Sequence, residues 1–336
     1  MDRAPVRPSD RAILGVGRPP STAPGAILAV RPGGLGDTIF AFPALRALRF
    51  AFPRARIAAA GNAGFLSLAR VSGFADEVVS ADAAWFGTLL SDEVPLAPEV
   101  RSFLAGFGLV LSFGFDDPVF VRRAKEAGAR DVLAFPSLPP PGTRRAVPAF
   151  LLDALRAIGV RRGDVAPRVV VPPEDLQAAR AQLRGRTPVL AVHPGSGSSR
   201  KNWDAAGFAE VGRRWGEGRG RGVLLLSGYA DAKAREGFLR AFGPADFLLE
   251  ARDRPIVEVA ALLAASSVYL GNDSGVTHLA AAVGVPVLAL FGRASPAMFR
   301  PAGERVRVFR SRALERLGPS TVWRALGPLL LGRTRR

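Results

Sequence analysis

The sequence alternates short apolar runs with segments of helical period, and this alternation constrains its fold more than any other feature. Apolar runs bounded by Pro or Gly predict strands at residues 26–30, 55–61 and 108–114. Helices are predicted at residues 43–52, 64–73 and 149–160. Pro43 is expected near the start of the regular helix; the alternative is a helix that kinks at Pro43. Strands that alternate with helices indicate an α/β fold with parallel sheets and right-handed crossovers.

The second half repeats the alternation after a crossover at residues 161–173. Strands are predicted within residues 187–197, 222–228, 267–273 and 285–292. Helices are predicted at residues 174–183, 206–217, 255–266 and 275–283, with a terminal helix at 319–331 interrupted by Gly327 and Pro328. Two such runs predict two Rossmann-like domains whose parallel sheets face a central cleft. The predicted division is a flexible basic arm (1–25), an N-terminal domain (26–165), a C-terminal domain (166–310) and a helical tail (311–336).

The composition of the chain limits its partners and its compartment. Its 46 basic and 29 acidic residues give a formal net charge of +17, which attracts nucleic acid, an acidic membrane face or phosphorylated substrates. The alternative is that the charge reflects only mutational bias toward Arg, Ala, Gly and Pro. No nucleic-acid-binding module is recognisable, so no nucleic-acid partner is expected. The absence of Cys excludes disulfides and thiolate metal sites. No secretory signal or transmembrane run is evident, and a cytoplasmic location is expected.

Residue types that are scarce in this chain gather in two short stretches. Lys, His and Asn together occupy only eight positions, which are Lys125, Lys201, Lys233, His193, His278, Asn62, Asn202 and Asn272. Five of the eight lie within residues 193–202 and 272–278. This clustering marks both stretches as candidate sites.

A glycine-rich turn follows the first predicted strand and ends in an isolated acid. In "PGGLGD" the residues Gly33, Gly34 and Gly36 permit a turn that larger side chains would block. Asp37 then lies at the carboxyl edge of the sheet, where open α/β folds bind ligands. Its carboxylate can cap the next helix or take a proton from a substrate hydroxyl. No second acid and no metal-binding cluster accompany it, so metal-free chemistry is expected.

The stretch "HPGSGSSRKNW", residues 193–203, follows a strand and is rich in small residues with exposed amides. Such a loop can wrap an anion, with Ser196 offering a hydroxyl and Lys201 a compact positive charge. The alternative is a solvated Ser/Gly loop with a surface Lys. It is neither a Walker A loop nor a dinucleotide fingerprint.

A third stretch, "GNDSGVTHLAAAVGVP", places a capped helix after a strand. Asp273 and Ser274 are good N-cap residues, and Gly284 is placed to end the helix. The free amides and positive end of this helix suit a phosphate or diphosphate, to which His278 can donate. The alternative is an ordinary capped helix that contains a hydrogen-bonded His.

These three stretches, in this order and spacing, resemble glycosyltransferase family 9, the lipopolysaccharide heptosyltransferases. The likeness covers about residues 26–310. It implies a GT-B fold with the donor nucleotide in the C-terminal domain and the acceptor in the N-terminal domain. It also implies inverting transfer of heptose from ADP-heptose without a metal or other cofactor.

The resemblance assigns roles to individual residues. Asp37 matches the general base, and Gly33, Gly34 and Gly36 form the acceptor-side loop. The donor-binding residues that it implies are Ser196, Lys201, Asp231, Asp273, Ser274, Gly275, Val276 and His278. Among these, Lys201 contacts the diphosphate, Asp231 the ribose and Asp273 the sugar. The adenine is expected near Arg254 and Pro255.

The expected function is transfer of a sugar to a lipopolysaccharide core or a related surface glycan, by an enzyme that docks on the anionic inner membrane face. Two alternatives remain open. One is a GT-B-like nucleotide-sugar epimerase or hydrolase, which would turn over the nucleotide sugar without an acceptor. The other is a non-catalytic binder of a nucleotide sugar or a nucleic acid, for which Asp37 would be dispensable.

Overall fold

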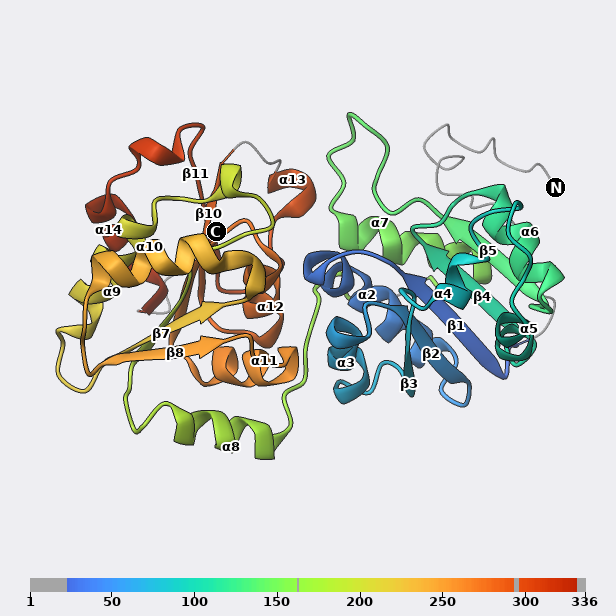
Figure 1. Ribbon diagram of the computed structural model, residues 1–336, viewed down its shortest axis with the longest axis horizontal. Helices are drawn as coiled ribbons and strands as arrows, with labels where there is room; N and C mark the ends of the chain where they lie inside the picture. Colours follow the sequence, from blue (N-terminus) through green and yellow to red (C-terminus); the bar gives the residue numbers. More distant parts are fainter. Residues whose placement is uncertain (1–22, 162, 293–295, 331–336) are drawn as a thin grey trace. The chain divides into compact units, whose positions relative to one another are not determined.

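The computed structural model describes residues 23–161, 163–292 and 296–330 of the chain (Figure 1). The chain divides into two compact units, Met1–Pro167 and Arg168–Arg336. The predicted division lay two residues earlier, between residues 165 and 166. Most of the expected basic arm (1–25) lies outside the described residues.

The first unit is built on a five-stranded parallel sheet in the order β3-β2-β1-β4-β5. Its strands are β1 (Ala26–Arg31), β2 (Arg56–Gly61), β3 (Glu77–Ser80), β4 (Leu109–Phe113) and β5 (Asp131–Phe135). Its helices are α2 (Leu35–Ala51), α3 (Ala63–Val71), α4 (Ala84–Gly87), α5 (Pro98–Leu104), α6 (Pro118–Glu126) and α7 (Val147–Ala154), the last continued by a 3-10 turn at Leu155–Ile158. The central strand β1 pairs with both β2 and β4, in the register Ile27 to Ile57 and Ile27 to Leu109.

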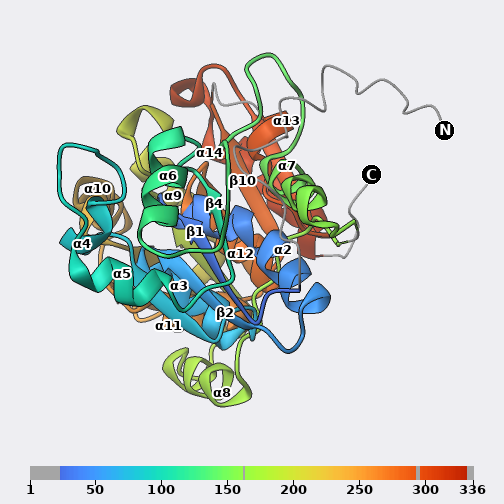
Figure 2. The ribbon, with the colours of Figure 1, turned by 90° about the vertical axis from the view of Figure 1, so that its right-hand side faces the viewer.

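Helices cover both faces of this sheet, which is why its inner strands are continuous apolar runs. Leu28 and Val30 of β1 pack with Val100 of α5 and Phe120 of α6 on one face. Helices α2 and α7 pack against each other away from that cluster (Figure 1, Figure 2).

Helix α2 begins eight residues before the predicted helix start. It runs from Leu35 to Ala51 and contains Pro43 in its interior, so the expectation that Pro43 lies near the helix start was wrong. An interior proline costs a helix about 3 kcal/mol, because it removes one hydrogen bond and crowds the preceding turn. Burial of Phe40, Phe42 and Leu45 offsets that cost. The longer helix also places Asp37 in its first turn instead of in a preceding loop.

The second unit is built on a six-stranded parallel sheet in the order β11-β10-β9-β6-β7-β8. Its strands are β6 (Val189–His193), β7 (Gly222–Ser227), β8 (Leu248–Arg252), β9 (Val268–Asn272), β10 (Val287–Phe291) and β11 (Val306–Arg310). Its helices are α8 (Pro173–Gln182), α9 (Ala205–Gly216), α10 (Ala232–Phe242), α11 (Ile256–Ala265), α12 (Gly275–Val283), α13 (Pro296–Phe299) and α14 (Pro319–Leu330). Short 3-10 turns lie at Ser199–Lys201, Tyr229–Asp231 and Leu314–Arg316.

The terminal helix α14 belongs to the core of the second unit. Val322 and Leu326 are buried beside Trp215 of α9 and Leu288 of β10. The helix continues from Pro319 to Leu330 through Gly327 and Pro328, so the predicted interruption was wrong. Burial of the apolar side chains of α14 offsets the helix destabilisation caused by these two residues.

No described helix combines the length and the apolar character that crossing a bilayer requires. The two sheets also share a topological feature. In each, the chain starts at an inner strand, builds outward to one edge and then returns to the other side of that starting strand. The reversals fall between β1 and β4 and between β6 and β9. Ligands of open α/β sheets bind in the crevice at the carboxyl ends of the strands at such points.

Candidate functional site

The switch point of the first unit holds the predicted base, Asp37. Its side chain is 43% exposed, although both carboxylate oxygens have hydrogen-bond donors. Arg31 Nη2 donates to Asp37 Oδ1 at 2.8 Å, and the backbone N–H of Gly34 donates to Oδ2 at 3.0 Å. Asp37 therefore caps α2 and is oriented from two sides, while part of the carboxylate remains accessible to a substrate.

Arg31 is the residue of this site that sequence reasoning missed. Its side chain is only 4% exposed, and it donates to the backbone oxygens of Phe113 at 2.6 Å and Asp37 at 3.2 Å as well as to the Asp37 carboxylate. Burial lowers the pKa of the Arg31 guanidinium, and the charge of Asp37 partly opposes that shift. Arg31 thus joins the ends of β1 and β4 to Asp37. Its place directly before "PGG" was the available signal.

Within the glycine-rich turn, position 33 requires glycine for a steric reason. Gly33 has φ of +120°, and a Cβ there would lie 2.7 Å from Asp37 Oδ2. Gly34 is the N-cap of α2 in an extended conformation, and Gly36 lies within the first turn of that helix. The side chain of Asp37 folds back over Gly33, and no larger residue at position 33 leaves that space open.

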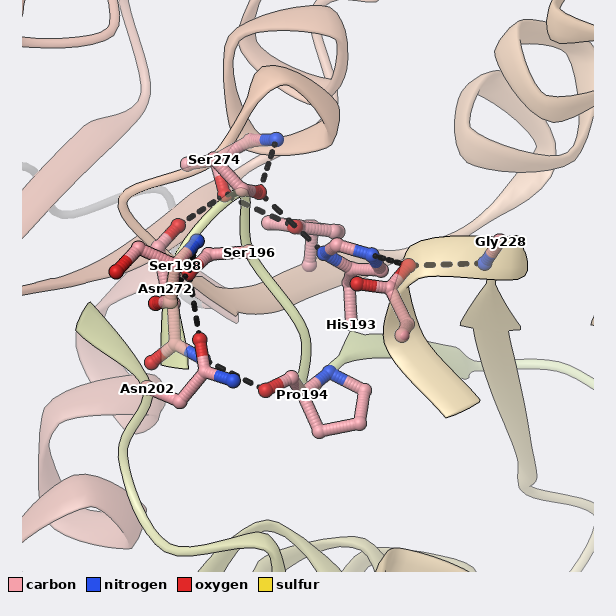
Figure 3. Close-up of polar contacts among 11 residues, drawn as sticks. His193, Pro194, Ser196, Ser198, Asn202, Gly228, Asn272 and Ser274 are labelled. Atoms are coloured by element: carbon pink, nitrogen blue, oxygen red, sulfur yellow. Dashed lines mark hydrogen bonds and ion pairs between the residues drawn. The ribbon is translucent and has the colours of Figure 1, made fainter. Parts of the chain in front are cut away.

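In the second unit, the ends of β6 and β9 are joined by a buried amide. Asn272 is fully buried; its Oδ1 accepts the N–H of Trp203 at 2.9 Å, and its Nδ2 donates to Pro194 O at 2.8 Å (Figure 3). The bonds fix the loop of residues 194–203 to the end of β9. Sequence reasoning noted the scarcity of Asn272 but gave it no role.

Ser196 organises the loop that contains it. Its Oγ lies 2.7 Å from Ser198 O and 2.6 Å from Asn202 Oδ1, and it accepts the N–H of Ser198 at 3.3 Å (Figure 3). The residue is buried, so its hydroxyl serves the shape of the loop in this structure.

The predicted diphosphate cation lies beside the predicted sugar-binding acid. Lys201 Nζ is 2.9 Å from Asp273 Oδ2. The side chain of Lys201 is 49% exposed, whereas that of Asp273 is 7% exposed. Lys201 and Asp273 thus form an ion pair in which the carboxylate is buried and the ammonium remains accessible to solvent.

The amino end of helix α12 lies beside this ion pair, because Asp273 directly precedes the N-cap of the helix. Ser274 is the N-cap, and its Oγ accepts the N–H of Thr277 at 3.4 Å, while Gly284 ends the helix with φ of +87°. Gly275 and Val276 are the first two helical residues, so their N–H groups have no acceptor within the helix. His278 lies further along α12 and is buried. The positive helix end and Lys201 therefore belong to the same switch point.

Asp231 faces inward and pairs with a His that sequence reasoning gave no role. Its Oδ2 lies 3.0 Å from His193 Nε2 and accepts the N–H of Gly228 at 2.8 Å. Burial raises the pKa of the Asp231 carboxyl, but the hydrogen bond and charge of His193 and the Gly228 N–H outweigh burial and leave the pKa lowered. The position of His193, the last residue of β6, was the signal that could have found it.

Arg254 and Pro255, which were predicted to lie near the adenine, follow the end of β8, the strand next to β7. Arg254 follows β8 and lies 3.8 Å, Nη1 to Oε2, from Glu258 in α11. It lines a cavity of about 310 Å³ together with Arg184 and Glu250. The structure therefore groups Ser196, Lys201, Asp273, Ser274 and the start of α12 at one switch point. Arg254 lies apart from this group, between the edge strand β8 and helix α11.

Comparisons with known proteins match this chain to one family. The family model of glycosyltransferase family 9 (heptosyltransferase) matches residues 139–318. Lipopolysaccharide heptosyltransferase 2 of Salmonella typhimurium is 27% identical over 141 residues, which cover 41% of this chain and 40% of that protein. The protein of the same name from Escherichia coli K12 is 28% identical over 132 residues, which cover 38% of each chain. The alignments therefore span about two fifths of the length of these relatives.

Solved structures show the same fold over nearly the whole chain. The family 9 glycosyltransferase of Veillonella parvula has a TM-score of 0.76 at 18% identity and covers 92% of this chain and 98% of its own. The E. coli ADP-heptose lipopolysaccharide heptosyltransferase II has a TM-score of 0.74 at 19% identity and covers 91% of this chain and 99% of its own. These likenesses confirm the predicted α/β class of GT-B type. Because the family model matches more than half of the sequence, the chain belongs to glycosyltransferase family 9, the heptosyltransferase family.

Proposed function

We propose that this protein is an inverting, metal-independent glycosyltransferase that moves heptose from ADP-heptose to a hydroxyl of a lipopolysaccharide core or a related surface glycan. The observation that carries the proposal is that each unit has one candidate feature at its own topological switch point. One is the cation Lys201, held beside the free amides of α12. The other is the oriented, partly exposed carboxylate of Asp37.

The donor is proposed to bind at the second switch point with its diphosphate against the start of α12. The N–H groups of Gly275 and Val276 and the ammonium of Lys201 supply the positive field that a diphosphate requires. A solved E. coli heptosyltransferase with ADP, 16% identical to this chain and with a TM-score of 0.69, supports the choice of an adenine nucleotide. The same groups would hold the donor without a metal bridge.

Asp37 is proposed as the general base of the transfer. Its carboxylate accepts the proton of the acceptor hydroxyl while that oxygen forms a bond to the anomeric carbon. The bond from the anomeric carbon to the diphosphate oxygen breaks on the opposite side, and its electron pair leaves with ADP. This geometry inverts the anomeric configuration. Arg31 and the Gly34 N–H hold the carboxylate in one orientation, which keeps the base aligned with the hydroxyl.

The leaving diphosphate gains negative charge as the glycosidic bond breaks. Amides and an ammonium that are already in place stabilise that charge most strongly in the transition state, because they need no reorganisation. Asp273, held by Lys201, is proposed to accept a hydroxyl of the donor sugar. Asp231, which closes the loop after β7, is proposed to lie beside the ribose.

The net charge of +17 supports an anionic acceptor and docking on an anionic membrane face. The test is flotation with phosphatidylcholine vesicles and with vesicles that also contain phosphatidylglycerol. Docking of this kind predicts binding to the anionic vesicles alone, weakened by salt. Equal flotation with both vesicle types would remove membrane docking from the proposal and leave the transferase activity standing.

The proposed function is tested first by calorimetry with ADP, UDP, GDP and ADP-heptose, followed by transfer to a heptose-deficient lipopolysaccharide core. Selective binding of ADP and ADP-heptose, with a heptosylated product by mass spectrometry, is the expected result. Preference for UDP or GDP would overturn the donor. Release of free sugar at the same rate with and without acceptor would indicate a hydrolase. No binding of any of the four would contradict an enzyme that uses these donors.

A further inference from the structure

We propose that His193 is a positioning residue that joins the loop of Asp231 to the start of α12 through one defined tautomer, with hydrogen on Nε2 and an accepting lone pair on Nδ1. The inference rests on the proposed function in one respect: the two elements that His193 joins are those assigned to the donor nucleotide.

His193 lies between the two elements and contacts both. It is the last residue of β6 and is 3% exposed. Its Nε2 is 3.0 Å from Asp231 Oδ2, and its Nδ1 is 3.3 Å from Ser274 Oγ (Figure 3). Both nitrogens of the ring are therefore used inside the protein.

The direction of these bonds follows from the chemistry of their partners. A carboxylate only accepts, and Asp231 Oδ2 already accepts the N–H of Gly228. His193 Nε2 must therefore carry the hydrogen. In the neutral ring the other nitrogen, Nδ1, is an acceptor, so the inferred neutral tautomer requires Ser274 to donate its hydroxyl hydrogen to Nδ1.

This direction determines what Ser274 can do. Its single hydroxyl hydrogen points to His193, and its oxygen accepts the N–H of Thr277 as the helix cap. The hydroxyl of Thr277 donates in turn to Asn272 O at 2.5 Å, and the hydroxyl of Tyr269 donates to Thr277 Oγ1 at 2.9 Å. Ser274 Oγ also lies 3.2 Å from Thr277 Oγ1, and the inferred tautomer assigns the Ser274 hydrogen to His193 instead of to Thr277. The Ser274 hydroxyl therefore bonds within the protein and does not donate to the anion. The anion is expected to bind the backbone N–H groups of Gly275 and Val276, which follow Ser274.

The Asp231 end is equally constrained. A Cβ on Gly195 would lie 1.8 Å from Asp231 Oδ1, so the loop after β6 lies directly against this carboxylate. Three loops therefore converge on the His193–Asp231 pair: residues 193–198, 228–231 and 272–277. A side chain that fixes all three sets the positions of the groups assigned to the diphosphate and the ribose.

The first test measures the tautomer on the wild-type protein without any ligand. The chain contains only two His residues, so 15N-labelled histidine gives two ring systems in a long-range 1H–15N spectrum, and the His193→Gln variant assigns them. At pH 8 we expect the His193 ring as the Nε2–H tautomer. A ring with hydrogen on Nδ1, or one that averages both tautomers, would overturn the inference even if every variant failed to fold.

The second test compares ADP affinity among three variants. His193→Gln keeps a donor at the Nε2 position for Asp231, His193→Asn keeps an acceptor at the Nδ1 position for Ser274, and His193→Ala keeps neither. ADP affinity is expected to fall about tenfold in His193→Gln and in His193→Asn, each of which keeps one of the two bonds. The loss is expected to be larger in His193→Ala, which keeps neither. Val268→Ala serves as the control, because it opens a cavity at the amino end of β9 and lowers the melting temperature without touching the network.

An ADP affinity that falls no further in His193→Ala than in Val268→Ala would overturn the positioning role. The two proposals fail differently. If the wild type bound none of the nucleotides, the proposed function would fail, while the tautomer spectrum would still decide whether His193 joins Asp231 to Ser274.

Discussion

The ammonium of Lys201 lies 2.9 Å from the carboxylate of Asp273, and the two side chains differ sharply in exposure. The acid is buried and the Lys is half exposed. Asp273 therefore fixes the position of the ammonium, and the proposed function requires such a preorganised cation beside the leaving diphosphate.

Replacing Lys201 should impair both binding and chemistry. Lys201→Ala removes a charge-assisted contact to a developing charge, which costs about 2–4 kcal/mol, or about 10²–10³ in kcat. ADP affinity should fall in the same variant. Steady-state kinetics and calorimetry measure the two effects. Lys125→Ala, an exposed change in the first unit, is the matched control. Near-normal turnover by Lys201→Ala would refute the role of this cation.

Adding one methyl group at Gly33 should displace the proposed base. In Gly33→Ala the new Cβ would meet Asp37 Oδ2 at 2.7 Å, and φ of +120° strains any residue with a side chain. We expect a loss of stability of about 1–3 kcal/mol and a lower kcat. Denaturant unfolding and transfer rates measure these effects. Gly25→Ala is the control, because a Cβ at position 25 contacts nothing within 4 Å. Unfolding midpoints that shift equally in both variants would contradict the steric argument.

The pair of Asp231 and His193 should make stability depend on acid pH. Since the folded-state pKa of Asp231 is lowered, this carboxylate contributes stability above its unfolded pKa of about 3.9, and the contribution is lost as pH falls through the lower folded value. Asp231→Asn should therefore be less stable than wild type at pH 7, with a difference that shrinks below about pH 4. Thermal unfolding across pH 3–7 measures it. The deficit of Val268→Ala, which adds no titrating group, should stay nearly constant. A deficit of Asp231→Asn that widened toward acid pH would contradict the assignment.

The strands that sequence reasoning found are the inner strands, and those it missed are the edges. β1, β2, β4, β6, β7, β9 and β10 are apolar runs with helices on both faces, whereas β3, β5, β8 and β11 lie at the edges of the two sheets. Three of the edge strands have exposed or half-buried positions along most of their length, as in Leu248–Arg252. Such strands lose the continuous apolar signal that marks a buried parallel strand.

Within the candidate site, the residues that the sequence located are those marked by local motifs, and the ones it missed act through contacts distant in sequence. Local motifs located Asp37, Lys201 and the start of α12, because the signals of a turn and of a helix cap depend on residues that are adjacent in sequence. The contacts of Arg31 and His193 were not predictable in this way, since Arg31 reaches Phe113 and His193 reaches Ser274 across about 80 residues of sequence. Only the pairing of β1 with β4, and of β6 with β9, brings these residues together.

The central claim is that Asp37 removes the acceptor proton while a separate set of residues holds the donor. The most direct measurement compares wild type with Asp37→Asn, by heptosyl transfer from ADP-heptose at saturating donor and by calorimetry with ADP. Asn can still accept the Gly34 N–H, so the cap of α2 is largely retained. The account predicts that transfer falls by about 10²–10⁴ while ADP affinity is unchanged. Transfer at the wild-type rate by Asp37→Asn would contradict it, and Asp37 would then be only the cap of its helix.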